Sequence, residues 1–159
     1  MYDAVSVGST DKDAAVRRIE LAVGVVFLGF ASGAAVAQGT LGELLDAGAV
    51  KLSKQQVLET VIGANVSGRT RAGGTQHTDY KSDGTYSGSY AGTGIYSAGY
   101  FGKWTLDDTG KLCIEGQAGL KGTPSAGCVC YYRLADQLYI GPDEESNRSG
   151  SVLMRTVKR

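Results

Sequence analysis

Several features that point to common activities are scarce or missing in this chain. It has one histidine, three cysteines and two prolines in 159 residues, and its 16 basic residues balance 16 acidic ones. Neither sign of charge forms a long block, so the sequence lacks the basic footprint of a nucleic-acid binder or of a polybasic membrane patch. We therefore expect no nucleic-acid partner.

Catalytic motifs are equally sparse. The sole histidine, His77, lies in the polar stretch TQHTDYK. Asp79 follows on the same face of an extended strand, but serines are too frequent for their presence to indicate a catalytic triad. There is no G-x-S-x-G motif, and the glycines at 92 and 94 lack the third glycine and the helix of a nucleotide-binding loop. The sequence predicts a surface histidine, no cofactor and no enzymatic activity.

The N-terminal segment has the pattern of a secretory signal peptide. Arg17 and Arg18 precede an apolar run from Leu21 to Phe30, and small residues follow, with alanines at Ala35 and Ala37. A basic segment, an apolar segment and an A-x-A site in this order predict cleavage after the second alanine. An uncleaved anchor is the alternative, although the apolar stretch is at the short limit of the roughly 20 residues that span a bilayer.

Cleavage at this site would give a mature chain with no membrane span and a periplasmic or secreted location. The mature part begins with one strong helix signal. Ser53 and Gln56 have the spacing of a capping box, and Gly63 supplies a stop signal. The apolar residues between them predict a short amphipathic helix over about 54–62, which we expect to brace a β-structure.

The rest of the chain shows the period of two that indicates β-strands. The chain has 24 glycines and nine tyrosines, a mixture that favours short strands and tight turns over helices. Between positions 76 and 106 nearly all aromatic residues stand at even positions, and turn-forming clusters such as KSDG and DDTG separate the strands. We predict strands near 65–71, 75–81, 85–91, 95–106, 111–116, 128–134, 138–141 and 151–157.

This pattern predicts a mainly β protein. We expect a small antiparallel meander, forming a barrel or a strongly curved sheet of about seven to eight strands, with one short N-terminal helix. The chain then divides into a signal peptide at 1–37, a helical lead-in at 38–64 and a β-domain at 65–159.

An aromatic stripe runs along the predicted inner face of the strands. We interpret it mainly as core, because an exposed stripe of this length would be a sticky patch. The alternative is that these side chains line a cavity and stack on a sugar or an apolar ligand. The stripe consists of Tyr86, Tyr90, Tyr96, Tyr100 and Trp104.

The three cysteines allow several arrangements. A zinc site with His77 is disfavoured, because a one-residue spacer between Cys128 and Cys130 is shorter than usual ligand spacings. A disulfide between these two neighbours would be strained, because residues i and i+2 of a strand stand near the limit of bridging geometry. Cys113 can pair with either of them. If Cys128 stayed unpaired at the strand entrance, it would leave an exposed thiol in an oxidising compartment.

Short motifs in the mature chain resemble an uncharacterised family of exported proteobacterial proteins, the domain of unknown function numbered nine hundred and ninety-five. This resemblance implies an envelope location and no established activity, and its cysteine pattern implies a disulfide between Cys113 and Cys130. The motifs are Gly102-Lys103-Trp104, Gly110-Lys111-Leu112-Cys113 and Cys130-Tyr131, with Leu52-Ser53 and Val66-Ser67-Gly68 upstream.

Together these observations predict an exported, disulfide-stabilised, non-enzymatic β-domain that acts in the cell envelope as a binding or structural accessory. Its partner would be an envelope component or a small ligand. The alternative is a lipocalin-like barrel that binds a small apolar or sugar ligand along the tyrosine stripe.

Overall fold

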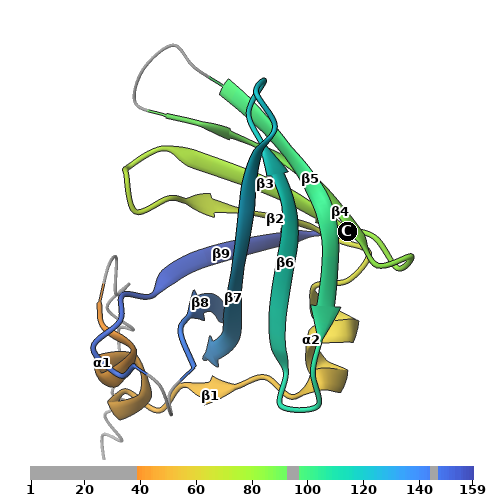
Figure 1. Cartoon of the computed structure of the whole chain (residues 1–159). Coiled ribbons are helices and arrows are strands. Elements are labelled where there is room, and N and C mark those ends of the chain that lie inside the picture. The colour runs from red at the N-terminus through yellow and green to blue at the C-terminus, as the bar shows by residue number, and fades with distance from the viewer. Residues whose placement is uncertain (1–38, 93–96, 144–146) are drawn as a thin grey trace, which may run out of the picture. The chain divides into compact units, whose positions relative to one another are not determined.

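The computed structural model describes residues 39–92, 97–143 and 147–159, and the predicted signal peptide with Ala35 and Ala37 lies outside them, as does Tyr96. Within these ranges the chain forms two short helices and nine strands (Figure 1). They are α1 (Leu41–Asp46), β1 (Val50–Lys51), α2 (Lys54–Thr60), β2 (Asn65–Arg69), β3 (Thr75–Tyr80), β4 (Thr85–Ala91), β5 (Ser97–Leu106), β6 (Lys111–Ala118), β7 (Thr123–Leu134), β8 (Gln137–Gly141) and β9 (Leu153–Lys158).

The strands form a closed up-and-down barrel. Each strand from β2 to β9 pairs antiparallel with the next strand of the chain, and β9 pairs back with β2, so that eight of the described strands close the barrel. The short β1 lies outside this circle and pairs with the end of β7. The predicted antiparallel meander barrel is confirmed. Closure of the barrel removes the free edges that an open sheet would expose.

β7 is longer than predicted and changes partners along its length. Its first part, which includes Pro124, pairs with β6, whereas its last part pairs with β8 and β1. The stretch TPSAGC has little apolar alternation, so the sequence signal begins only at Cys128. Proline is tolerated in this strand because the first part of β7 has a described partner on one side only.

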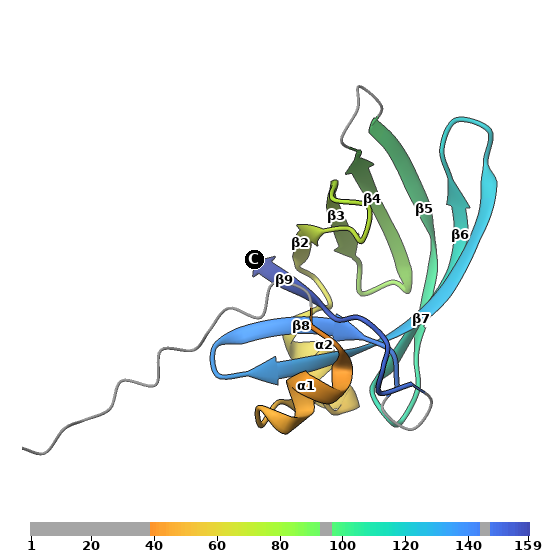
Figure 2. The same cartoon turned by 90° about the vertical axis from the view of Figure 1, so that its left-hand side faces the viewer.

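Side chains on the two faces of the barrel wall belong to two separate hydrophobic clusters. The inner cluster lies inside the barrel and includes Val57 and Val61 from α2, which lies at one end of the barrel (Figure 1). The outer cluster lies between α1 and the outward faces of β7 and β8 (Figure 2). Its buried members are Leu41, Leu44, Ala49, Cys130, Tyr132, Tyr139 and Val152.

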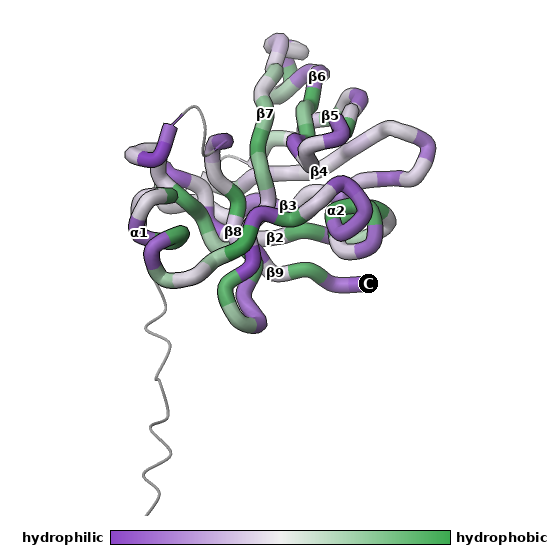
Figure 3. Tube along the Cα trace, turned by 90° about the horizontal axis from the view of Figure 1, so that it is seen from below, coloured by the Kyte–Doolittle hydropathy of each residue, from purple (hydrophilic) through white to green (hydrophobic). Residues whose placement is uncertain are grey.

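Both helices begin with a capping box. The predicted box of Ser53 and Gln56 opens α2, and an equivalent box of Thr40 and Glu43 opens α1. Figure 3 shows hydrophobic and hydrophilic segments next to each other along both helices, as expected for elements that cover a core on one side only. Only one of the two helices was predicted. The capping box of Thr40 and Glu43 was the sequence signal from which α1 could also have been predicted.

Candidate functional site

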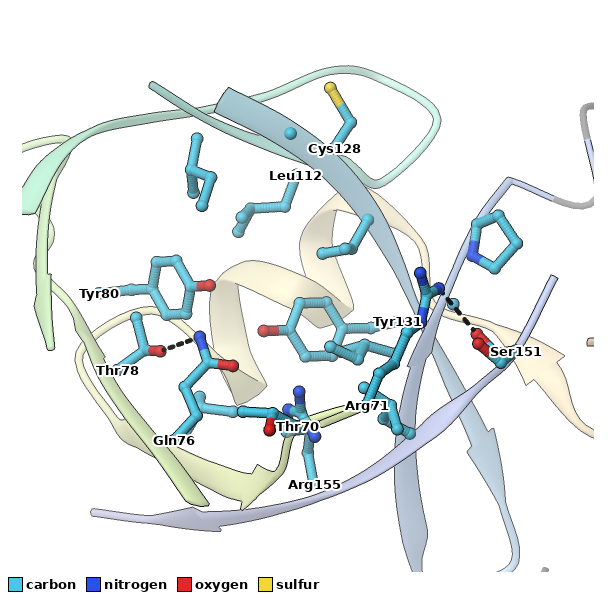
Figure 4. Close-up of a pocket in the computed structure, with 18 residues that line it drawn as sticks. Thr70, Arg71, Gln76, Thr78, Tyr80, Leu112, Cys128, Tyr131, Ser151 and Arg155 are labelled. Atoms are coloured by element: carbon cyan, nitrogen blue, oxygen red, sulfur yellow. Dashed lines mark hydrogen bonds between the residues drawn. The ribbon is translucent and has the colours of Figure 1, made fainter. Parts of the chain in front are cut away.

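A cavity of ≈380 Å³ lies inside the barrel (Figure 4). Its volume is at the lower end of the roughly 300–1,000 Å³ that is typical of small-molecule sites. The apolar residues of its lining, called here the apolar wall, are Val66, Leu112, Ile114, Val129, Ile140 and Leu153. The polar residues of its lining, called here the polar wall, include Thr70, Gln76, Thr78, Tyr80, Tyr131 and Arg155. Among the described residues that line the cavity, none is acidic.

The cavity reaches the surface beside the first part of β7. Gly127 and Arg71 both line it and are both exposed, so they mark its mouth. Arg71 donates a hydrogen bond of 3.4 Å from its Nη2 to the carbonyl of Ser151 (Figure 4). The cavity is therefore open to solvent at this point.

Arg155 is the most unusual residue of the cavity. It stands on the inner face of β9 between the inward positions of Leu153 and Val157, and only 7% of its surface is exposed. Its Nη1 donates to the carbonyls of Arg69 and Met154, each at 2.9 Å. Burial lowers the pKa of the guanidinium, which nonetheless stays charged near neutral pH.

The fold makes room for this arginine with a glycine. A β-carbon on Gly68 of β2 would come within 2.6 Å of the Arg155 Nη1 and within 3.0 Å of its Cδ. The same β-carbon would lie 2.5 Å from the carbonyl oxygen of Met154, so a larger residue would clash with the backbone of β9 as well as with the guanidinium. Sequence reasoning missed Arg155, although the alternation Leu153, Arg155, Val157 was a signal that an arginine faces inward.

Two tyrosines form a hydrogen-bonded pair in the lining of the cavity. The hydroxyl groups of Tyr80 on β3 and Tyr131 on β7 point toward each other, with Arg155 below them in the view of Figure 4. Burial raises the pKa of Tyr80 to about 12 and raises the pKa of Tyr131 well above its ordinary value. Both phenols are therefore neutral at physiological pH, and because one of them donates to the other, one proton of the pair is available to a ligand.

A chain of hydrogen bonds fixes the orientation of other side chains in the polar wall. The Tyr100 hydroxyl donates its one proton to the carbonyl of His77 at 2.7 Å. The Thr78 hydroxyl, 2.6 Å from the same oxygen, must then be the donor to Tyr100, and it accepts from the Gln76 amide at 3.4 Å. This chain fixes the direction of each hydroxyl and leaves the amide oxygen of Gln76 beside the cavity.

A second hollow of ≈240 Å³ adjoins the first and shares Thr70, Gln76 and Ile114 with it. Tyr86, Tyr90 and Tyr100 line this hollow. Tyr86 is only 2% exposed, and its buried hydroxyl has no hydrogen-bond partner among the described residues. A buried polar atom without a partner is costly, so a ligand or a water molecule is expected beside it.

The predicted aromatic stripe therefore has two roles. Tyr86 and Tyr100 belong to the inner core and also line the second hollow. Tyr90 is 41% exposed, and Trp104 packs half-buried against the core and donates from Nε1 to the carbonyl of Lys81 at 2.9 Å. Ligand binding by these residues stays a prediction.

The disulfide joins Cys113 to Cys128, so the expected Cys113–Cys130 pairing was wrong. In the register of β6 and β7, Cys113 stands directly opposite Cys128, with the two Cα atoms 4.0 Å apart, whereas Cys130 stands opposite Lys111. Cys130 is a free thiol buried in the outer cluster, and burial raises its pKa. The argument that Cys128 should not remain an exposed free thiol predicted the correct partner.

The remaining polar candidates do not come together. His77 is exposed on β3, away from the two cysteines of the disulfide that the zinc hypothesis would need. In the part of the chain that the structure describes, no group of three or more histidine, cysteine or acidic side chains could hold a metal ion. Nor does any helix in these described ranges have the length and hydrophobicity to cross a membrane.

Comparisons with protein-family models, with curated proteins and with solved structures found no match to this chain. The resemblance to the exported proteobacterial family therefore stays a prediction.

Proposed function

We propose that this protein is an exported, non-enzymatic β-barrel that binds a small molecule in its interior, as a binding accessory of the cell envelope. The observation that carries this proposal is the cavity, with its apolar wall and its ordered polar wall. A barrel with a purely structural role needs neither, because apolar side chains alone can fill the interior of a small barrel.

One buried polar group supports binding because its hydrogen-bonding capacity is not used within the described residues. The buried hydroxyl of Tyr86 has no partner there, whereas the hydroxyls of Tyr80 and Tyr131, which border the cavity, are hydrogen-bonded to each other. Few such groups are left unpaired in folded proteins, since each one costs about 1–3 kcal/mol. A bound molecule that supplies the missing partner would recover this free energy.

The non-enzymatic part of the proposal is based on the chemistry of the lining. Proton transfer near neutral pH usually needs a histidine or a carboxylate. None of the described lining residues is of these types, and Cys128 is held in the disulfide. Export is supported by the signal pattern before position 38 and by the disulfide, which is typical of oxidising compartments.

Binding is tested with an uncharged fluorescent probe, N-phenyl-1-naphthylamine, which brightens in apolar surroundings. The mature protein should enhance its fluorescence, and Ile114→Trp should abolish the enhancement, because Ile114 borders both hollows. The matched control is Val50→Trp at a 65% exposed position. Circular dichroism checks that each variant is folded, and Leu153→Phe is a milder second way to fill the cavity.

Enhancement that survives both cavity-filling substitutions would overturn the binding proposal and would favour a structural accessory role. Export is tested separately by cell fractionation and N-terminal sequencing. The expected result is a periplasmic or secreted chain that begins at or near Gln38. A full-length chain in the cytoplasm would contradict it.

A further inference from the structure

We propose that the cavity is specific for a molecule with one carboxylate group and an apolar body, with the carboxylate bound to Arg155. This inference is based on the proposed binding function and names its ligand class. The supporting observations are the buried charge, the donors that surround it and the apolar wall.

The charge of Arg155 is not balanced by the part of the protein that the structure describes. The guanidinium is buried, and no carboxylate pairs with it among the described residues. Its two hydrogen bonds go to neutral carbonyls of Arg69 and Met154. A buried charge without a counterion is expensive, so such groups are normally paired. An anionic ligand would be the missing counterion.

The geometry also suits a carboxylate. Both hydrogen bonds of Arg155 come from Nη1, which leaves the donors on Nε and Nη2 for a ligand. A carboxylate can accept two parallel hydrogen bonds from one guanidinium, which is a strong and directional contact. The neutral hydroxyls of Tyr80 and Tyr131 lie above Arg155 in the view of Figure 4, and because one of them donates to the other, one proton of the pair can be donated to the same group.

The rest of the cavity selects the body of the ligand. The apolar wall is made of branched aliphatic side chains, including Leu112, Ile114 and Val129. A sugar or a compact inorganic anion would leave these side chains without apolar contacts. An exposed arginine at the mouth, Arg71, would attract an anion toward the entrance, and the described lining has no acidic residue to repel it.

The test compares acids with the matching alcohols. Decanoate and 3-phenylpropanoate are titrated into the mature protein at pH 7 by calorimetry, alongside decan-1-ol and 3-phenylpropan-1-ol. At least one acid should bind about tenfold or more tightly than its alcohol, because a hydrogen bond to a charged group contributes about 1.5–3 kcal/mol. The acid preference should disappear in Arg155→Met, which keeps most of the side-chain volume, while alcohol binding persists.

Arg148→Gln is the control, because Arg148 pairs with Asp46 at the surface and does not line the cavity. It should keep the full preference for acids. Alcohols that bind the wild type as well as acids, or an acid preference retained in Arg155→Met, would overturn this inference and leave the binding proposal standing. If neither acids nor alcohols nor the neutral probe bind, both proposals fail. The comparison in the wild type does not depend on the folding of any variant.

Discussion

Two neighbouring residues of β7, Tyr131 and Tyr132, show how differently the two faces of the barrel wall are built. Both are fully buried. Tyr132 faces the outer cluster under α1, where its hydroxyl donates to the carbonyl of Pro142 at 2.6 Å. Tyr131 faces inward, where its hydroxyl borders a cavity beside a buried arginine. The Tyr132 hydroxyl is satisfied within the protein, whereas the inner face includes the unpartnered Tyr86 hydroxyl and the donors of Arg155, which a ligand can use.

This comparison teaches that one strand can serve packing and binding at the same time, because alternate side chains point to opposite faces. Substitutions in the outer cluster should therefore reduce stability and spare binding. Substitutions that remove only a polar group from the inner polar wall should reduce binding and cost less stability.

The largest effect is expected for Leu44→Ala in the outer cluster. Leu44 is fully buried under α1, so its truncation should lower the free energy of unfolding by about 2–5 kcal/mol. Urea denaturation measures this loss, and the affinity for the neutral probe should stay unchanged. Leu58→Ala on the exposed side of α2, at a position that is 36% exposed, is the control and should cost much less. A loss of probe binding in folded Leu44→Ala would contradict the separation of the two faces.

Removal of the disulfide should have the next largest effect. The bond between Cys113 and Cys128 links residues 15 apart in the sequence, and the chain-entropy model gives a stabilisation of about 3 kcal/mol for such a loop. The double variant Cys113→Ser/Cys128→Ser should unfold at correspondingly lower urea concentration. Alkylation provides the control, because buried Cys130 should react only after unfolding. Rapid alkylation of Cys130 in the native wild type would show that the outer cluster is not closed.

High pH should weaken the inner face. The pKa of Tyr80 is raised by burial from about 10 to about 12, so the folded state keeps a proton that the unfolded chain releases. The contribution of Tyr80 to the free energy of unfolding is fully present below pH 10. It falls by about 2–3 kcal/mol as the pH rises toward 12. Urea melts across this range should show a shallower decline for Tyr80→Phe. Tyr90→Phe, at an exposed position, should decline like the wild type, and an equal slope for all three would refute the assignment.

The smallest effects are expected at the helix caps. Thr40 opens α1 over the outer cluster, and Ser53 opens α2, which contributes to the inner one. Each substitution by alanine should cost about 1 kcal/mol, because one capping hydrogen bond is lost. Denaturation of the single and double variants measures whether the two costs add. Strong coupling between them would mean that the two caps interact through the structure and that the two clusters are not independent.

Most of the barrel could be predicted from the sequence, but little of the candidate site could. The period of two predicted the strands and placed Tyr86 and Tyr100 inward, because one face of each strand had to be buried. Arg155 was overlooked because an arginine is assumed to be exposed unless a partner is known. The cysteine register could not be derived either, since it depends on which residues of β6 and β7 face each other, and a two-residue shift along β7 changes the partner.

The most direct test of the account is a methyl NMR titration of the mature protein with decanoate. The account predicts shifts for methyl groups that line the cavity, those of Leu112, Ile114 and Ile140, and none for Leu41, Leu44 and Val152 of the outer cluster. The shifts should saturate at one equivalent of decanoate. In Ile114→Trp, the methyl groups of Leu112 and Ile140 should no longer shift. Shifts confined to the outer cluster, or none at saturating decanoate, would contradict a binding site inside the barrel.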